Sequence, residues 1–204
     1  MKKENGDTII KTVNESDADE LLKIYAPYVQ NTAITFEYNV PGIAEFKSRI
    51  MNTLKKYPYL KAVRNGKIIG YAYLGEFKER DAYIHSAETS IYVKQKERRS
   101  GAGRAMYEAI EKTAKMQNIL NLNACIGVPR IEDEHLTLDS VKFHEKMGYT
   151  LVGKFNFSGY KFGTWYDMIW MEKMLGEHTN SPAGFRAFNT LEKEELASAG
   201  IDVG

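Results

Sequence analysis

The sequence is poor in cysteine and in long apolar runs. Only one of its 204 residues is a cysteine, and a single thiol cannot form an internal disulfide, so nothing points to an oxidising compartment. The apolar runs are too short to cross a bilayer as helices. Residues 1–7 are polar and lack the apolar centre of a signal peptide. We therefore expect a cytoplasmic protein that does not associate with membranes.

The sequence also lacks an excess of charge of either sign. Its 28 basic and 27 acidic side chains leave a formal net charge of +1, which gives no global field to attract a nucleic acid. Hydrophobic residues make up 43% of the chain, enough for a sizeable core. The length fits one domain, although two are possible. An enzyme or a small-ligand binding domain is the expected class.

The most informative stretch is Ile91 to Lys115, where a strand pattern changes to a basic glycine loop and then to a helix pattern. The start of a helix has free backbone N–H groups and a partial positive charge, so it binds anions. Gly101 and Gly103 let a phosphate approach the backbone. The pattern predicts a pyrophosphate site, and the alternative is a glycine turn on a solvated basic loop.

Two common phosphate motifs are absent from this stretch. There is no G-x-x-x-x-G-K-[ST], which excludes a P-loop. No third glycine follows Gly103 at the spacing of the dinucleotide fingerprint. The basic cluster is local, and this suits a small anionic ligand better than a duplex.

Hydrophobic periodicity predicts strands and helices along the rest of the chain. We expect strands at 8–13, 59–63, 68–74, 83–93, 120–128, 149–157 and 164–174. We expect a first helix after a cap formed by Ser16 and Asp19, and a second that starts at Pro41. The buried face of the second helix should consist of Ile43, Phe46, Ile50, Met51 and Leu54. Two further helices are expected, one after the glycine loop and one from Thr137 or Asp139 to Met147. Asn65-Gly66 predicts a hairpin turn between two of these strands.

We expect residues 8–175 to form one domain and residues 176–204 to form a C-terminal appendage. Residues 179–184 have the composition of a linker. A short helix capped by Asn189 and Glu192 is expected at 189–199. This appendage either docks on the main domain or a partner, or is disordered.

Several blocks together resemble one family of enzymes. The pattern R-R-x-G-A-G after a strand resembles the coenzyme A loop of the GCN5-related N-acetyltransferases. The blocks that resemble the phosphinothricin acetyltransferase branch are TAITFEYNVP (32–41), KYPYLKAVRNGKIIGYAYLG (56–75), FKERDAYIHSAETSIYV (77–93), SVKFHEKMGY (140–149) and GYKFGTWYDM (159–168). The resemblance implies a mixed α/β acyl-CoA N-acyltransferase fold, with a central, mostly antiparallel sheet flanked by helices. We also expect a homodimer.

The resemblance implies acetyl-CoA as cosubstrate, no metal, and a small-molecule amine as acceptor. The expected reaction is direct acetyl transfer to the amino group of a small amino acid or analogue, such as phosphinothricin or methionine sulfoximine or sulfone. Two alternatives stay open. The acceptor could be another amine (a polyamine, an aminoglycoside or a protein N-terminus), or the chain could be a non-catalytic acyl-CoA sensor.

The coenzyme residues follow from the same resemblance. They are Ile91, Tyr92, Val93, Arg98, Arg99, Ser100, Gly101, Ala102, Gly103, Arg104 and Thr137. Thr137 stands where the family usually has asparagine, and the loop before it, 130–136, is acidic and longer than usual. We read that loop as a solvated charged segment, because no metal-ligand spacing is present.

The candidate catalytic residues are Glu88 and His144. A carboxylate inside an apolar strand is costly unless it meets water or a partner, and a carboxylate can remove the proton of an attacking amine. The alternative for Glu88 is a solvated position. The branch has histidine where His144 stands, and an imidazole near its ordinary pKa can protonate the leaving thiolate. The alternative is a surface histidine.

The residues expected to face the acceptor are Phe36, Tyr73, Lys78, Arg80 and Tyr83. Two cations beside aromatic rings suit an anionic head group. As a plain charge run, the same segment would be a solvated turn. Cys125 is expected to be buried and inert, because no activating base lies near it in the sequence.

Overall fold

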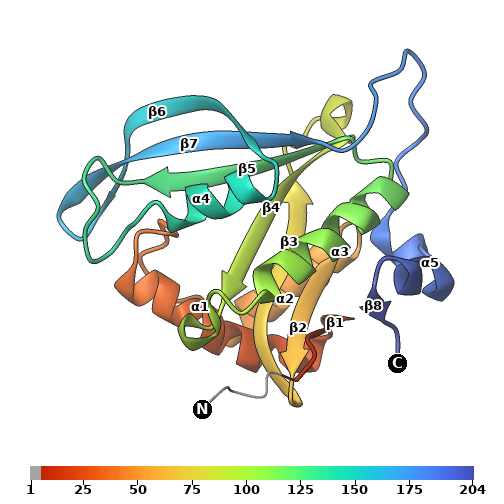
Figure 1. Ribbon diagram of the computed structural model, residues 1–204, viewed down its shortest axis with the longest axis horizontal. Coiled ribbons are helices and arrows are strands. Elements are labelled where there is room, and N and C mark those ends of the chain that lie inside the picture. The colour runs from red at the N-terminus through yellow and green to blue at the C-terminus, as the bar shows by residue number, and fades with distance from the viewer. Residues whose placement is uncertain (1–5) are drawn as a thin grey trace.

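The computed structural model describes residues 6–204. Within them, eight strands form one sheet in the order β6-β7-β5-β4-β3-β2-β1-β8 (Figure 1). The strands are β1 (Ile9–Thr12), β2 (Tyr59–Arg64), β3 (Lys67–Glu76), β4 (Ser86–Val93), β5 (Asn121–Val128), β6 (Thr150–Lys161), β7 (Thr164–Met174) and β8 (Ile201–Asp202). Only the β4–β5 and β1–β8 pairs of this described sheet are parallel. The predicted mixed, mostly antiparallel sheet is confirmed.

Helices cover both faces of the sheet (Figure 1). They are α1 (Ala18–Asn31), α2 (Ile43–Leu54), α3 (Ala102–Met116), α4 (Asp139–Lys146) and α5 (Lys193–Ser198). One apolar cluster joins α1 and α2 to the sheet, and a larger cluster joins α3 to the opposite face. Because strand side chains alternate between faces, each central strand contributes to both clusters. No helix of residues 6–204 is long and apolar enough to span a membrane.

The first two helices start differently from the prediction. The capping box is formed by Asn14 and Asp17, not by Ser16 and Asp19, because a short 3₁₀ turn precedes α1. The α2 helix begins at Ile43 after Gly42, two residues later than expected from Pro41.

The predicted buried face of α2 is too wide. Phe46 and Ile50 are buried, but Ile43 and Met51 are 37% and 41% exposed. A helix that rests on one side of a sheet buries only a narrow stripe, and these two residues lie at its margins.

The β2–β3 hairpin has the predicted turn. Asn65 and Gly66 both have left-handed backbone angles, with φ of 50° and 71°, as a two-residue hairpin turn of the primed type requires. The hairpin places Tyr73 of β3 opposite Ser90 of β4.

The two central parallel strands separate part-way along their length. Residues 86–88 of β4 pair with residues 121–123 of β5, and the pairing stops there. Beyond Glu88, β4 continues along β3, while β5 continues along β7. A parallel pair that diverges leaves one edge of each strand unpaired in the middle of the sheet. This opening organises the candidate site.

The C-terminal segment packs on the same apolar core as the rest of the described chain. Ile201 of β8 pairs with Ile10 of β1, and Lys11 forms an ion pair with Asp202 at 2.9 Å. Phe188 is 6% exposed and belongs to the larger apolar cluster. The segment therefore covers the edge of the sheet at β1, which would otherwise expose unpaired backbone groups.

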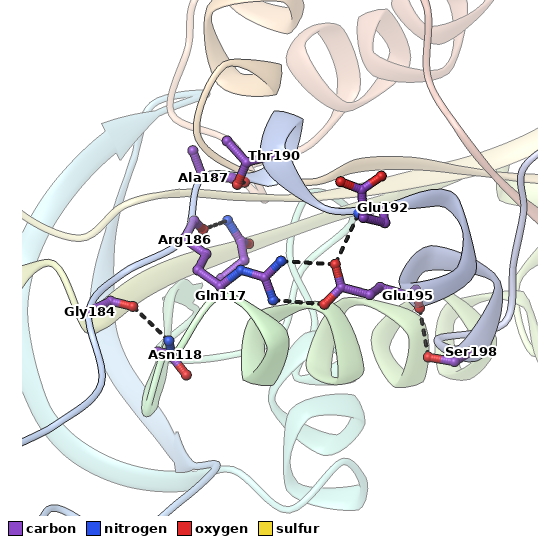
Figure 2. Close-up of polar contacts among 9 residues, drawn as sticks. All are labelled: Gln117, Asn118, Gly184, Arg186, Ala187, Thr190, Glu192, Glu195 and Ser198. Atoms are coloured by element: carbon purple, nitrogen blue, oxygen red, sulfur yellow. Dashed lines mark hydrogen bonds and ion pairs between the residues drawn. The ribbon is translucent and has the colours of Figure 1, made fainter.

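Polar contacts reinforce this packing at the C-terminal end of α3 (Figure 2). Arg186 donates two hydrogen bonds to Glu195, at 2.7 and 2.9 Å. The Gln117 side chain donates to the carbonyl oxygens of Lys56 and Arg186, at 2.7 and 2.9 Å. The capping box of α5 is formed by Glu192 and Glu195, so the predicted cap at Asn189 and Glu192 is wrong.

Candidate active site

A small cavity of about 60 Å³ lies in the opening between β4 and β5. Its lining includes Thr89 and Ile91, which face α3, together with Ser90 and Tyr92, which face α1 and α2. Residues that point to opposite faces of the sheet therefore meet in one cavity. The opening connects the two faces, so a group held on one face can react with a group held on the other.

The glycine loop leads into α3 beside this opening. Gly101 is the residue before the helix and has a left-handed backbone, with φ of 87°, which glycine adopts without strain. Ala105 is the first residue of the helix whose N–H bonds back to the Gly101 carbonyl, at 3.1 Å. The N–H groups of residues 102–104 thus point out of the helix start, as an anion site requires.

Gly103 lies in the first turn of α3 and has a packing role that the sequence did not reveal. A Cβ atom at this position would lie 3.2 Å from the Phe143 ring of α4 and 3.5 Å from Ile91. The missing side chain lets α3 and α4 approach each other next to the opening. Two of the basic side chains around it have partners within the protein. The Arg98 guanidinium lies 5.7 Å from the centre of the Tyr28 ring, and that of Arg104 lies 3.8 Å from the Glu108 carboxylate.

Glu88 is half-buried at the point where β4 and β5 part. It lies on the face of α1 and α2, because it alternates with residues that face α3. Burial raises the pKa of its carboxyl group above the ordinary value, and the nearby Lys78 ammonium partly opposes this shift. A carboxylate with a raised pKa is a stronger base, when ionised, than a solvated one.

His144 is buried, with 4% of its surface exposed, and lines the same cavity from the α4 side. Its Nδ1 lies 2.8 Å from the Ser140 carbonyl oxygen, and its Nε2 lies 2.8 Å from the Tyr107 hydroxyl. The carbonyl can only accept, so Nδ1 carries the proton and Nε2 accepts from Tyr107.

Burial lowers the pKa of His144 to about 4. The expectation of an imidazole near its ordinary pKa is therefore wrong. The reason is that α4, Tyr107 and Tyr149 enclose the ring, and burial in protein disfavours the charged form.

The expected acceptor residues do not all meet. Tyr73 and Lys78 lie near Glu88. Tyr73 of β3 pairs with Ser90 of β4, two residues after Glu88, and the Lys78 ammonium opposes the rise in the pKa of Glu88. The Lys78 ammonium lies 5.1 Å from the Phe77 ring and 5.4 Å from the Trp170 ring. Such cation–aromatic contacts hold the ammonium near the opening.

Arg80 and Tyr83 lie further out, on the exposed segment before β4. Tyr83 reaches the Phe77 ring at 5.9 Å. Phe36 lies near the end of β5, where its ring faces Tyr166 at 6.4 Å.

Cys125 is exposed, so the prediction of a buried cysteine is wrong. Its neighbours Ala124 and Ile126 face the core, and strand alternation turns Cys125 toward the cavity on the Glu88 face. The protein around the thiol and the Glu88 carboxylate raise its pKa to about 11, so the thiol is protonated and a poor nucleophile near neutral pH.

Trp170 was missed at the sequence level. It pairs with Cys125 across the β5–β7 ladder and is half-buried. The alternation of side chains along a strand, which places Cys125, would also place Trp170 beside the cavity, but only once β7 is known to be the partner of β5. Tyr107 was also missed, because its contact with His144 joins residues 37 positions apart.

The acidic loop at 130–136 is exposed at residues 130–132 and 134, as expected of a solvated segment, but Asp133 and Leu136 hold part of it against the protein. Asp133 accepts hydrogen bonds from the Tyr166 hydroxyl at 2.8 Å and from the N–H groups of His135 and Leu136, at 2.8 and 2.7 Å. Burial pushes the pKa of Asp133 up, but these hydrogen bonds outweigh it and hold the pKa below its ordinary value. Thr137 is exposed and accepts from the N–H of Asp139 at 3.3 Å. Within residues 6–204, no group of three or more side chains could hold a metal ion.

This fold and opening define a class of protein. A mixed sheet whose central parallel strands diverge beside a basic, glycine-containing helix start is the architecture of acyl-CoA N-acyltransferases. Residues 10–170 match the family described as "Acetyltransferase (GNAT) domain", and the chain belongs to that family. Residues 171–204 lie outside the matched region.

Named relatives indicate which acetyltransferases of this family the chain resembles. The chain is 29% identical over 168 residues to phosphinothricin N-acetyltransferase of Streptomyces viridochromogenes, which covers 82% of this chain and 88% of that enzyme. It is 26% identical to the L-methionine sulfoximine/L-methionine sulfone acetyltransferase of Salmonella typhimurium, over 83% of this chain and 95% of that enzyme.

A solved structure agrees with these relatives. The phosphinothricin acetyltransferase of Sinorhizobium meliloti in complex with acetyl-CoA superposes with a TM-score of 0.79, at 28% identity, over 86% of this chain and 93% of that one. The chain is thus an acetyl-CoA-dependent N-acetyltransferase, and it is similar to enzymes named as phosphinothricin acetyltransferases.

Proposed function

We propose that the protein moves an acetyl group from acetyl-CoA to the amino group of a small amino acid analogue with a compact anionic or strongly polar end. Phosphinothricin and methionine sulfoximine or sulfone are such molecules. The observation that carries this proposal is the half-buried Glu88 at the point where β4 and β5 part, with the Lys78 ammonium near enough to oppose the rise in its pKa. A base with a cation near it can take a proton from one end of a zwitterion and hold its anionic end.

Acetyl-CoA would bind on the opposite face. The edge of β4 at Ile91 supplies backbone groups to the pantetheine arm, because β5 has moved away from it. The Val93 carbonyl and N–H on the same edge bond to the Tyr28 hydroxyl, at 2.6 and 3.3 Å. The N–H groups at the start of α3 and the arginines at 98, 99 and 104 hold the pyrophosphate. Thr137, at the start of α4, is the remaining candidate for a pantetheine contact.

In the proposed reaction the acceptor amine loses a proton to Glu88, directly or through one water, and attacks the thioester carbon. The tetrahedral intermediate then expels the coenzyme thiolate as the amide forms. The thiolate takes up the second proton that the acceptor nitrogen loses, and the first proton passes from Glu88 to solvent, so that protons balance over the cycle. A neutral amine is required for attack, and α-amino groups are mostly protonated below a pH of about 8. Glu88 therefore removes the main barrier to reaction near neutral pH.

His144 was predicted to protonate the thiolate. Its imidazole is neutral near pH 7, because burial lowers its pKa to about 4. We propose that it serves the thiolate end by fixing the Tyr107 hydroxyl at the cavity wall, and that it can donate a proton only after gaining one during the reaction.

The acceptor proposal rests on the relatives together with the cations of this chain. Enzymes named for phosphinothricin and for methionine sulfoximine are 29% and 26% identical to it. Steady-state kinetics on phosphinothricin, methionine sulfone and spermidine tests the proposal. We expect the two amino acid analogues to be preferred, and Lys78→Ala to raise their KM without changing acetyl-CoA affinity. A clear preference for spermidine would overturn the acceptor assignment.

We also propose that two copies associate through β6. This edge strand exposes four large apolar side chains, Leu151, Val152, Phe155 and Phe157, each more than half exposed. An unpaired apolar edge is a template for pairing with another chain. Light scattering should give the mass of a dimer, and Val152→Asp should give a monomer. A wild-type monomer would contradict the proposal.

We propose a cytoplasmic location, because acetyl-CoA is a metabolite of that compartment. Cell fractionation tests this, and recovery of the chain outside the cytoplasm would contradict it.

A further inference from the structure

On the proposed function, the segment 32–38 forms one wall of the acceptor side, and it is neither a helix nor a strand. It carries Ile34, which lines the cavity, and Phe36, whose ring lies near the end of β5. A segment without regular structure keeps one conformation only if contacts from elsewhere fix it. The position of this acceptor wall is therefore set by residues outside the segment.

The strongest of these contacts comes from Lys161, at the end of β6. Its side chain is 3% exposed. The ammonium donates to three carbonyl oxygens, those of Val29, Thr32 and Thr35, at 2.8 Å each. All three of its N–H groups are used, and bonds from a charged donor are stronger than neutral ones.

The acceptors of Lys161 show what it fixes. Val29 and Thr32 lie at the C-terminal end of α1, where carbonyl groups lack helix partners and carry partial negative charge. Thr35 lies in the segment itself, and its hydroxyl meets that of Tyr25 at 3.0 Å. One ammonium thus ties the end of α1, the segment and the β6–β7 hairpin together.

Two glycines form a slot for the Phe36 ring. A Cβ atom at Gly159 would lie 2.3 Å from the tip of the ring, and one at Gly127 would lie 3.2 Å from it. Gly159 is on β6, two residues before Lys161. The same strand therefore contacts the segment 32–38 twice, through the Lys161 ammonium and through the space at Gly159 that the Phe36 ring fills.

We propose that Lys161 is a positioning residue for the acceptor: it holds residues 32–38 so that Ile34 and Phe36 form the wall against which the acceptor side chain is bound. This inference rests on the proposed function, because it concerns the acceptor of the same site. Lys161 does not touch the reacting atoms. Its loss should weaken acceptor binding and leave the coenzyme face unchanged.

Lys161→Met tests the role of the ammonium, since it keeps a side chain of similar length. Lys154→Met is the matched control. Lys154 lies on the same strand, and its ammonium pairs with the buried Asp167 carboxylate at 3.0 Å. Lys154→Met therefore also deprives a buried group of its charged partner, but at a place that does not contact residues 32–38. We expect Lys161→Met to raise the acceptor KM by about tenfold or more, as loss of orientation does, with acetyl-CoA affinity within twofold of wild type. Lys154→Met should change neither.

Gly159→Ala supplies a second test if Lys161→Met does not fold. The added methyl group must displace the Phe36 ring. Gly153→Ala on the same strand is the control, because a Cβ there meets nothing within 4 Å. We expect the acceptor KM to rise for Gly159→Ala and to stay at the wild-type value for Gly153→Ala. Unchanged KM in both Lys161→Met and Gly159→Ala would overturn the inference.

Hydrogen exchange separates this inference from the proposed function. We expect the amides of residues 32–38 to exchange faster in Lys161→Met than in wild type or Lys154→Met, whatever the acceptor is. If wild type acetylates none of the proposed acceptors but exchange still rises, the acceptor class is wrong and the positioning role stands. If exchange does not change, the positioning role is wrong.

Discussion

Replacing Glu88 with glutamine is the most informative single perturbation of the site. The change keeps the shape of the side chain and removes only the charge and the basic oxygen. Glu88 is half-buried beside the opening, and burial raises its carboxyl pKa. Because the group is a base only when ionised, wild-type kcat/KM should rise with pH through that raised pKa and then level off.

The size of the loss follows from the role of the base. General base catalysis contributes roughly 100-fold to 10,000-fold, which corresponds to about 3–5 kcal/mol of transition-state stabilisation. Without it, Glu88→Gln depends on the small fraction of acceptor that is already neutral. Below the pKa of the acceptor amino group, this fraction falls about tenfold per pH unit. The loss should therefore be greatest at low pH.

The assay is thiol release from acetyl-CoA, from which kcat/KM for an amino acid analogue is determined between pH 5.5 and 9. Glu76→Gln is the control, because Glu76 is an exposed carboxylate at the end of the adjacent strand and pairs with Lys56 at 3.2 Å. We expect Glu76→Gln to retain the wild-type profile and Glu88→Gln to rise steadily with pH. If Glu88→Gln keeps the wild-type rate and plateau, Glu88 is not the base.

Three further predictions follow from the coenzyme face, the α4 side and the C-terminal segment. Gly101→Glu should weaken acetyl-CoA binding at least about tenfold, because it places a carboxylate at an anion site. Calorimetry measures the affinity, with Gly42→Glu at the start of α2 as the control. Equal affinities of the two variants for acetyl-CoA would exclude the glycine loop from the coenzyme site. His144→Phe should leave the Tyr107 hydroxyl unpaired, which costs about 1–3 kcal/mol of stability, and lower turnover less than Glu88→Gln does; unchanged stability and turnover would remove the pair from the mechanism. Deletion of residues 185–204 should lower the melting temperature by roughly 10 °C, because Phe188 and Ile201 each contribute about 1.5–3 kcal/mol by burial; an unchanged melting curve would show that the segment does not stabilise the fold.

The order of strands and helices was predictable because it rests on local signals. Asn65-Gly66 can form only a few turns, and the change of period after Val93 marks a strand that ends and a helix that starts. Such signals need no knowledge of the partner element. They place Glu88 on a central strand and Gly101 at a helix start.

What could not be predicted depends on which element packs against which. His144 has a low pKa because Tyr107 and Tyr149 enclose it, and neither neighbour is known before α3 and α4 are docked. Cys125 faces the cavity only because β5 leaves β4 at that point. Met51 matches the helical period but is 41% exposed, at the margin of the buried stripe of α2. In each case the sequence determines the residue, and the long-range packing determines its environment.

The central claim is that the acetyl group passes from acetyl-CoA directly to the amine, through the opening beside Glu88. Rapid-quench single-turnover measurements with methionine sulfoximine, with intact-protein mass spectra of the same samples, test it most directly. The account predicts N-acetylated product within the first turnover while the mass of the protein stays constant, because the cavity's only thiol, Cys125, has a pKa raised to about 11. An acetyl group on the protein before product forms, or no product at all, would contradict it.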